Sequence, residues 1–240
     1  CSPRPSPSFW GSDAPAPSAF RRGSHSFLAV RRITAVMKVL LVNGSPHAKG
    51  CTHRALIEIA EELGSRGVES EIVHVRSDTP GCRACGYCRG SGRCVIDDQV
   101  NEIAARLDEF DAIVLGAPVY YAGPSGQICA FADRLFYSAG GRMAGKLGAS
   151  VVSCRRGGAT AAFDRLDKYF SISNMPVVSS NYWNQVHGNT PQEVEQDAEG
   201  LQTMRFLGAN MAWLLKCIEA GRNAGVDLPA YEQKIWTNFI

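Results

Sequence analysis

Four cysteines fall within thirteen residues of this chain, with the spacing C-x2-C-x2-C-x5-C. The same stretch contains three glycines and three arginines, so its side chains cannot form a packed core of their own. Thiolates that lie this close together are soft ligands, suited to one metal ion or one iron–sulfur centre. The candidate ligands are Cys82, Cys85, Cys88 and Cys94.

A glycine-containing loop, Gly44–Thr52, joins an apolar segment to the expected start of a helix. Its backbone N–H groups, hydroxyls and basic side chains lie at the positive end of a helix dipole, where a phosphate monoester fits. The loop has neither a Walker lysine pattern nor G-x-G-x-x-G, which argues against an ATPase and against a dinucleotide fingerprint. An ordinary glycine–proline turn capped by Thr52 is the alternative.

Two further loops carry residues that suit a planar, anionic ligand. In Gly116–Ser125 two tyrosines lie between two prolines, so the loop offers a flat aromatic surface and backbone donors. In Cys154–Gly158 two arginines precede two glycines, which suits an anionic ring edge or a phosphate. The alternatives are that the tyrosines only cover the end of a sheet and that the arginines form a solvated turn.

Short apolar segments alternate with amphipathic ones from Met37 onward. Strands are expected at 38–42, 71–75, 112–116, 149–153 and 176–179. Helices are expected from Thr52, from Asp97–Asp98, after Gly126, over 159–170, and from a capping box at 190–193 that opens one long helix. This alternation predicts an α/β fold with a doubly wound, five-stranded parallel sheet in three layers. In such a sheet the three loops meet at one edge, where ligands bind.

The combination of motifs resembles a known group of proteins. G-S-P-H-A-K-G-C-T, G-A-P-V-Y-Y-A-G, the cysteine stretch ending in C-V-I-D-D, and S-S-N-Y-W-N together resemble the flavodoxin-like NAD(P)H-dependent FMN reductase family, in its iron–sulfur flavoprotein branch. The likeness extends from Met37 to about Arg222, which is most of the chain. It implies a flavodoxin-like fold and a non-covalently bound FMN.

The resemblance also assigns roles to individual residues. The FMN phosphate would be contacted by Ser45, His47, Cys51 and Thr52; the isoalloxazine would lie along Pro118, Val119, Tyr120, Tyr121 and Gly123; its pyrimidine edge would lie near Arg155 and Gly157. Many relatives have arginine in place of His47 and asparagine or serine in place of Cys51, so these two side chains depart from the family pattern. A neutral histidine would hold the phosphate less strongly.

In the iron–sulfur branch the four clustered cysteines would hold a [4Fe–4S] cluster. The residues agree with this, because four ligands from one flexible loop are a compact arrangement that suits a cubane. Zinc is the rival, but four-cysteine zinc sites usually use two separated C-x2-C pairs, which are absent here. Spacing alone also allows the thiols to stay free.

The expected function is therefore that of an FMN-dependent oxidoreductase. Chemistry would take place at flavin N5, so no catalytic side chain is expected, and His74 and His187 are interpreted as structural. With a cluster present, single electrons would pass between FMN and a ferredoxin-like carrier, with NAD(P)H as another possible donor. The family implies a homo-oligomer. The rival interpretation is a non-catalytic, zinc-based or thiol-sensing interaction module.

Composition narrows the remaining choices. Of the 240 residues 45% are hydrophobic, which suits one globular domain with a sizeable core. No apolar run approaches the roughly 18 residues of a membrane span. Residues 37–240 are slightly acidic, so nucleic acid is not an expected partner. The nine cysteines lack the pattern of a disulfide scaffold, so a reducing, cytoplasmic location is expected.

The chain is expected to divide into three segments. Residues 1–36 are rich in Ser, Pro, Arg and Ala and predict a disordered or non-native extension, with a transit peptide or a lipidated Cys1 as alternatives. Residues 37–222 form the FMN-binding domain. Residues 223–240 are expected to be an irregular tail.

Overall fold

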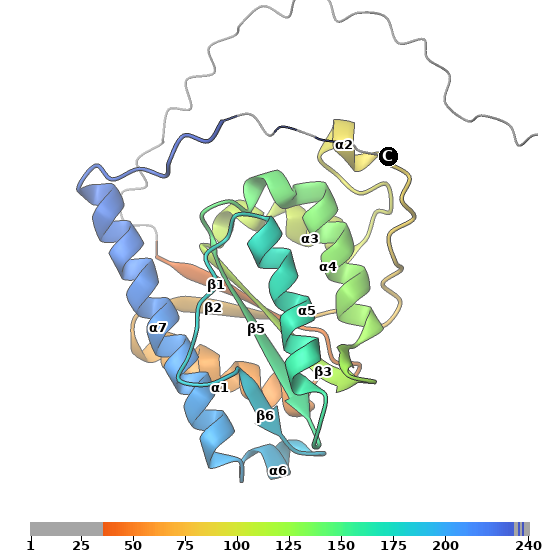
Figure 1. Cartoon of the computed structure of the whole chain (residues 1–240), viewed down its shortest axis with the longest axis vertical. Coiled ribbons are helices and arrows are strands. Elements are labelled where there is room, and N and C mark those ends of the chain that lie inside the picture. The colour runs from red at the N-terminus through yellow and green to blue at the C-terminus, as the bar shows by residue number, and fades with distance from the viewer. Residues whose placement is uncertain (1–35, 233–234, 236, 238–240) are drawn as a thin grey trace, which may run out of the picture. The chain divides into compact units, whose positions relative to one another are not determined.

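A parallel β-sheet lies between two layers of helices in the computed structural model, which describes residues 36–232, 235 and 237 (Figure 1). The strands run in the spatial order β2-β1-β3-β5-β6, and the short β4 pairs antiparallel with β3. The strands are β1 (Lys38–Asn43), β2 (Glu69–His74), β3 (Ala112–Tyr120), β4 (Gly123–Pro124), β5 (Leu147–Cys154) and β6 (Gln185–His187). The prediction for residues 1–36 lies outside the described residues, apart from Val36.

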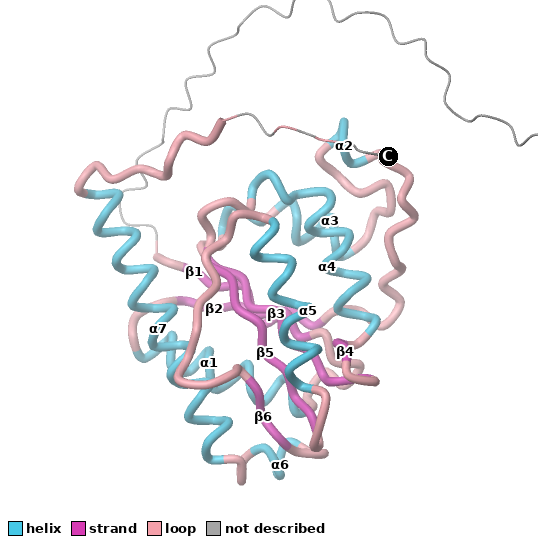
Figure 2. The backbone as a smooth tube through the Cα atoms, in the orientation of Figure 1, coloured by secondary structure: helices cyan, strands magenta, loops and turns pink. Residues whose placement is uncertain are grey.

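Helices connect consecutive parallel strands and return the chain to the same edge of the sheet (Figure 2). They are α1 (Cys51–Ser65), α2 (Cys88–Ser91), α3 (Gln99–Ala105), α4 (Gly126–Ala139), α5 (Ala159–Ile172), α6 (Pro191–Val194) and α7 (Ala198–Asn223), with 3-10 turns η1 (Leu107–Glu109) and η2 (Gly140–Arg142). None of the helices described is both long and apolar enough to cross a bilayer.

Both faces of the sheet are buried, as the continuous apolar strands predict. In β1 the side chains of Val39 and Leu41 pack in one cluster with α1 and α7, whereas Leu40 and Val42 pack in the other with α3, α4 and α5. All four are fully buried, and successive strand residues point to opposite faces. The predicted three-layer, doubly wound parallel sheet is therefore confirmed.

The fifth parallel strand lies later in the chain than predicted. Residues 176–179 contribute one isolated bridge, in which Val177 pairs with Gly148, while β6 forms at Gln185–His187. The sequence prediction placed the strand at Val177 and Val178, the apolar pair that follows Pro176. The true strand has a single fully buried side chain, Val186, so it has no apolar run to mark it.

The helix predicted from the capping box is two helices. Thr190 caps α6 as expected, because its hydroxyl accepts a hydrogen bond from the Glu193 N–H at 3.2 Å. The chain then breaks and α7 starts anew, capped by the Asp197 carboxylate, which accepts from the Gly200 N–H at 3.0 Å. The predicted single helix is therefore interrupted, because Asp197 starts a new helix seven residues after Thr190.

An ionic network ties the edge strand β2 and its neighbour β1 to the chain beyond α3. Arg106 donates two hydrogen bonds to Glu71, at 2.8 and 2.7 Å, and Lys38 lies 2.8 Å from the same carboxylate. The hydrogen-bonded Arg106 lowers the pKa of Glu71 from 4.5 to about 2; burial opposes this and Lys38 adds to it. Glu71 therefore stabilises the fold through its charged form.

We expect Glu71→Gln to lower the free energy of unfolding by about 1 kcal/mol at pH 7, a value reduced because water reaches Arg106. A lowered carboxyl pKa gives stability that is complete above the unfolded pKa of 4.5 and is lost as the pH falls towards 2. The difference in the free energy of urea unfolding between wild type and variant should therefore become smaller as the pH falls from 4.5 towards 2. A difference that is independent of pH, or that is matched by Glu61→Gln on the exposed face of α1, would contradict this account.

Candidate functional site

The first predicted loop follows β1 and is held in shape by its own hydrogen bonds. Asn43 accepts from the Ser45 N–H at 3.1 Å and donates to the Ala48 carbonyl at 3.0 Å. The Ser45 hydroxyl accepts from the His47 N–H at 3.1 Å, and a ring nitrogen of His74 lies 2.7 Å from the Ser45 carbonyl. The loop is therefore preformed, and His74 has the structural role that was expected.

Helix α1 begins directly after this loop with unused backbone donors. Its N-cap is Gly50, and no described side chain caps it, so the first-turn N–H groups of Cys51, Thr52 and His53 have no intrahelical acceptor. The buried Thr52 hydroxyl lies 2.8 Å from that of Ser153 at the end of β5. Free N–H groups, a hydroxyl and the positive end of a 15-residue helix form an arrangement that binds anions.

Burial favours the neutral forms of two side chains at this helix start. Burial, followed by the charges of Lys49 and His74, lowers the pKa of His53. Burial likewise raises the pKa of the Cys51 thiol, which points to the Gly188 carbonyl at 3.5 Å. Cys51 therefore offers the loop a backbone N–H, while its side chain is directed towards the turn after β6.

The second loop is a tight hairpin that holds its backbone under strain. Val119 and Tyr120 at the end of β3 pair with Pro124 and Gly123 of β4. The two turn residues, Tyr121 and Ala122, have φ angles of 50° and 61°, in a left-handed region that costs a non-glycine residue about 1 kcal/mol or more. The Tyr121 side chain is fully exposed. Strain of this kind is concentrated at ligand-binding sites.

The third loop packs directly against this hairpin. Gly158 has φ +89°, and a Cβ there would lie 3.0 Å from both the Ala122 Cα and the Val119 side chain. Arg155 and Gly157 are exposed beside it. The three loops therefore meet at the carboxyl edge of the sheet, as predicted, and a glycine is needed for their close approach.

The cysteine loop emerges from the same edge after β2 and is anchored on α4 by a buried arginine. Arg134 is 1% exposed and is the largest fully buried side chain among the described residues. It forms a bidentate ion pair with Asp98, at 2.6 and 2.7 Å. Its Nε–H donates to the Cys94 sulfur at 3.2 Å, and its other N–H groups donate to the carbonyls of Pro80 and Ile96.

The four cysteines of this loop differ in how firmly they are placed. Cys94 is half-buried, and its backbone exchanges hydrogen bonds with the Asn101 side chain at 3.0 Å in both directions. Cys82 and Cys85 are exposed, and Cys88 lies at the start of α2. All eight described cysteines are free thiols, and within the described residues no three acidic, histidine or cysteine side chains converge as a metal site would require.

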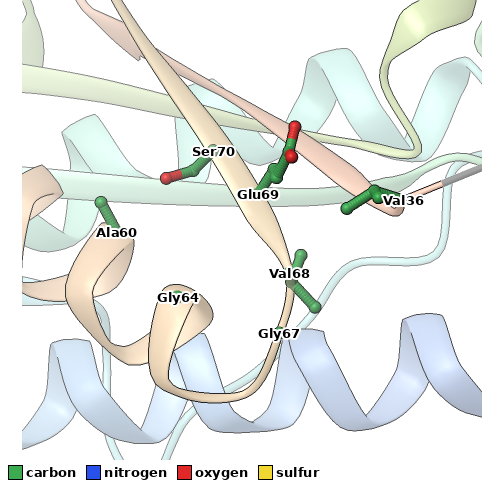
Figure 3. A pocket seen from close by; sticks show the side chains of 7 residues that line it. All are labelled: Val36, Ala60, Gly64, Gly67, Val68, Glu69 and Ser70. Carbon is green, nitrogen blue, oxygen red and sulfur yellow. The ribbon is translucent and has the colours of Figure 1, made fainter.

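The surface has two hollows, one far from the three loops and one next to the third loop. One, of about 440 Å³, lies where α1 ends and β2 begins, at the opposite edge of the sheet (Figure 3). Its lining is apolar apart from two polar side chains at the start of β2, those of Glu69 and Ser70. The other, of about 200 Å³, lies beside β6 and includes Tyr182, Trp183, His187 and Asp197. The two aromatic rings of its rim have centroids 4.8 Å apart.

Several residues that shape the site carried no sequence signal of their own. Ser153 reaches Thr52, and the Ser125 hydroxyl donates to the Gly44 carbonyl at 2.6 Å, but both contacts join residues more than eighty positions apart. Arg134 could have been found, because it follows Phe131 by three positions on the apolar face of α4. A charge on a buried helix face requires a partner.

This fold and these loops agree with the comparison to known families. Residues 37–190, more than half of the chain, match the family described as NADPH-dependent FMN reductase. The chain belongs to this family. It is accordingly an FMN-dependent oxidoreductase, which favours the enzymatic interpretation over a non-catalytic module.

Within the NADPH-dependent FMN reductase family, the chain falls in the iron–sulfur flavoprotein branch. It is 32% identical to an iron–sulfur flavoprotein of Methanocaldococcus jannaschii over 76% of its own length and all of the relative. It is also 32% identical to an iron–sulfur flavoprotein of Methanosarcina thermophila, over 78% of its length and all of that protein.

Solved structures show the same fold at low sequence identity. An NAD(P)H:quinone oxidoreductase from Methanothermobacter marburgensis superposes with a TM-score of 0.57 at 16% identity, over 74% of this chain and 98% of that one. A flavodoxin from the domain Archaea superposes with a TM-score of 0.52 at 19% identity, over 75% and 99%. The flavodoxin-like fold is thereby established.

We expect Asp98→Asn to lower the free energy of unfolding of the metal-free protein by about 2 kcal/mol, because it leaves the buried Arg134 guanidinium without a counter-charge. Asparagine still caps α3 at this position, so the substitution isolates the loss of charge. Urea unfolding measures the change. The matched control is the neighbouring Asp97→Asn, at an exposed side chain paired with Arg93. It should leave the free energy of unfolding unchanged. Equal effects of Asp98→Asn and Asp97→Asn would show that the pair of Arg134 and Asp98 does not add to the stability of the fold.

Proposed function

We propose that this FMN oxidoreductase passes single electrons between FMN, bound where the three loops meet, and a [4Fe–4S] cluster held by the four clustered cysteines. The observation that carries the proposal is that all four thiols are free in one loop that leaves the flavin edge of the sheet directly after β2. The relatives named iron–sulfur flavoproteins, matched over their whole length, support it.

The FMN phosphate would lie on the first turn of α1. The free N–H groups of Cys51 and Thr52, the hydroxyls of Ser45 and Thr52, and the exposed His47 surround that position. The buried Ser45 hydroxyl already accepts one hydrogen bond, so its proton is free to be donated. An uncapped helix start next to Lys49 is a suitable environment for a dianion.

The isoalloxazine would lie along the strained hairpin. Pro118, Val119, Tyr120, Tyr121 and Gly123 supply its aromatic and backbone surface, and Arg155 and Gly157 would lie at the pyrimidine edge. A bound flavin supplies both two-electron and one-electron redox chemistry. The protein positions the ring, keeps its phosphate paired, and requires no side chain as a general acid or base for flavin reduction.

The chemistry of the donor set fits the iron–sulfur cluster. Cys82, Cys85, Cys88 and Cys94 are soft ligands on one loop, and Ala84, Gly86 and Gly92 adopt left-handed backbone conformations that let this loop turn sharply. Burial raises the pKa of the Cys51, Cys129 and Cys154 thiols, which keeps those cysteines protonated and apart from this chemistry.

The partners follow from the same surface. A single-electron carrier of the ferredoxin type would dock where the exposed Arg83 and Arg89 flank the cysteines, and NAD(P)H remains a possible donor at the flavin. Phe206 and Trp213, two helical turns apart, are exposed on α7. This apolar face supports assembly into a homo-oligomer. A reducing, cytoplasmic compartment would suit the free thiols.

We expect Thr52→Val to raise the dissociation constant for FMN about tenfold, because a hydrogen bond to a charged phosphate is lost. Riboflavin, which has no phosphate, should bind wild type and variant equally. Flavin fluorescence quenching gives both constants. Thr203→Val, which removes a buried hydroxyl from α7, is the control. Equal losses for FMN and riboflavin would place the phosphate elsewhere.

We expect alanine at any of the four clustered cysteines to abolish iron binding in protein reconstituted anaerobically. Metal analysis and the absorption spectrum should give about four irons per wild-type chain. Cys217→Ala, at an exposed cysteine on α7, should retain all of them. Bound zinc, or iron that survives the substitutions, would contradict the cluster while leaving the FMN site intact.

A further inference from the structure

Arg134 uses its whole hydrogen-bonding capacity on one small region of the molecule. A guanidinium has five N–H donors, and all five of its contacts are accounted for: two to Asp98, one each to the Pro80 and Ile96 carbonyls, and one to the Cys94 sulfur. Pro80 precedes the cysteine motif and Ile96 follows it. A single side chain therefore fastens both ends of the loop at one point of α4.

The contact to sulfur goes beyond what anchoring the loop requires. Asp98 and the two carbonyls already account for four of the donors, and they would hold the loop without the cysteine. The fifth donor, Nε–H, donates to the Cys94 sulfur at 3.2 Å. Because the guanidinium lies between this sulfur and Asp98, the positive end of the buried ion pair faces the thiol.

We propose that Arg134 is a positioning residue for the cluster: it fixes Cys94 as the pre-set ligand and raises the cluster's reduction potential through its N–H···S hydrogen bond. This inference rests on the proposed iron–sulfur function. Reduction adds one electron and one negative charge to a thiolate-ligated centre and breaks no bond to cysteine. A donor and a positive charge beside a ligand sulfur stabilise that added charge, and hydrogen bonds to the sulfurs are known determinants of such potentials.

The other three ligands lack an equivalent anchor. Cys82 and Cys85 are exposed, and the Cys82 sulfur accepts only from the Ala84 N–H of the same loop, at 3.5 Å. Cys88 is half-buried, but it lies on the four-residue α2, which has no buried residue. Cys94 is held on its sulfur by Arg134 and on its backbone by Asn101. Cluster assembly therefore starts from one fixed thiol, around which the rest of the loop closes.

The test compares the reduction potential of the reconstituted cluster in three variants. Arg134→Gln removes the positive charge and should make reduction about tenfold less favourable, which is about 59 mV for a one-electron couple. Asp98→Asn removes the negative charge and keeps the N–H···S bond, so it should shift the potential upwards. Arg134→Lys keeps the charge without Nε–H and should show a smaller decrease than Arg134→Gln. Arg76→Gln, at an exposed arginine paired with Glu102, is the control and should leave the potential unchanged.

The opposite signs separate an electrostatic role from simple loop support. If Arg134 only held the loop, breaking the ion pair from either side would shift the potential in the same direction or not at all, and either result would overturn the proposal. If Arg134→Gln fails to fold, the direction of the Asp98→Asn shift decides. A wild-type protein without iron would instead overturn the iron–sulfur function and this inference together, and iron analysis identifies that case.

A second readout needs no cluster. In the metal-free protein the Cys94 N–H donates to Asn101, so its peptide should exchange hydrogen slowly by mass spectrometry. Arg134→Gln should accelerate this exchange at least as far as the exposed peptide that contains Cys82, and Arg134→Lys should restore part of the protection. Unchanged exchange in Arg134→Gln would show that Arg134 does not pre-set Cys94.

Discussion

The site depends on one geometrical constraint: all five parallel strands end at the same edge of the sheet. Short contacts turn that constraint into a rigid arrangement. The hydroxyls of Thr52 and Ser153 join the first loop to the end of β5, where the third loop begins, and Ser125 fastens the first loop to the start of α4. Gly158 lets the third loop lie against the hairpin. Free donors at the start of α1 are a consequence, because the loop that precedes the helix is occupied with its own hydrogen bonds.

A second constraint acts on the cysteine loop, which cannot form a core of its own. Its shape comes from α4, through the buried charge of Arg134 and its counter-ion Asp98. The two regions are close along the chain, since His74 contacts the phosphate loop through Ser45 and the first clustered cysteine, Cys82, follows eight residues later. The end of β2 therefore contacts the phosphate loop and leads into the cysteine loop.

The regular elements were predictable from sequence because burial on both faces leaves continuous apolar strands, as in β1 and β5, between amphipathic helices. The edge strand β6 was not, since Gln185 and His187 are only partly buried and Val186 alone is fully buried. The predicted cofactor loops were brought together as expected. The turn at Tyr121 and Ala122 could not be foreseen, because these residue types rarely adopt positive φ. The contacts of Arg134 with Cys94 and Asp98 could not be predicted from the sequence either, because they depend on tertiary packing.

An anaerobic crystal structure of the protein with FMN, including anomalous data at the iron edge, tests the central claim most directly. The account predicts the FMN phosphate within hydrogen-bonding distance of Thr52 and the first-turn N–H groups of α1. It also predicts one compact iron peak surrounded by the sulfurs of Cys82, Cys85, Cys88 and Cys94. A flavin bound away from the three loops, or a cysteine loop that holds zinc or no metal, would contradict it.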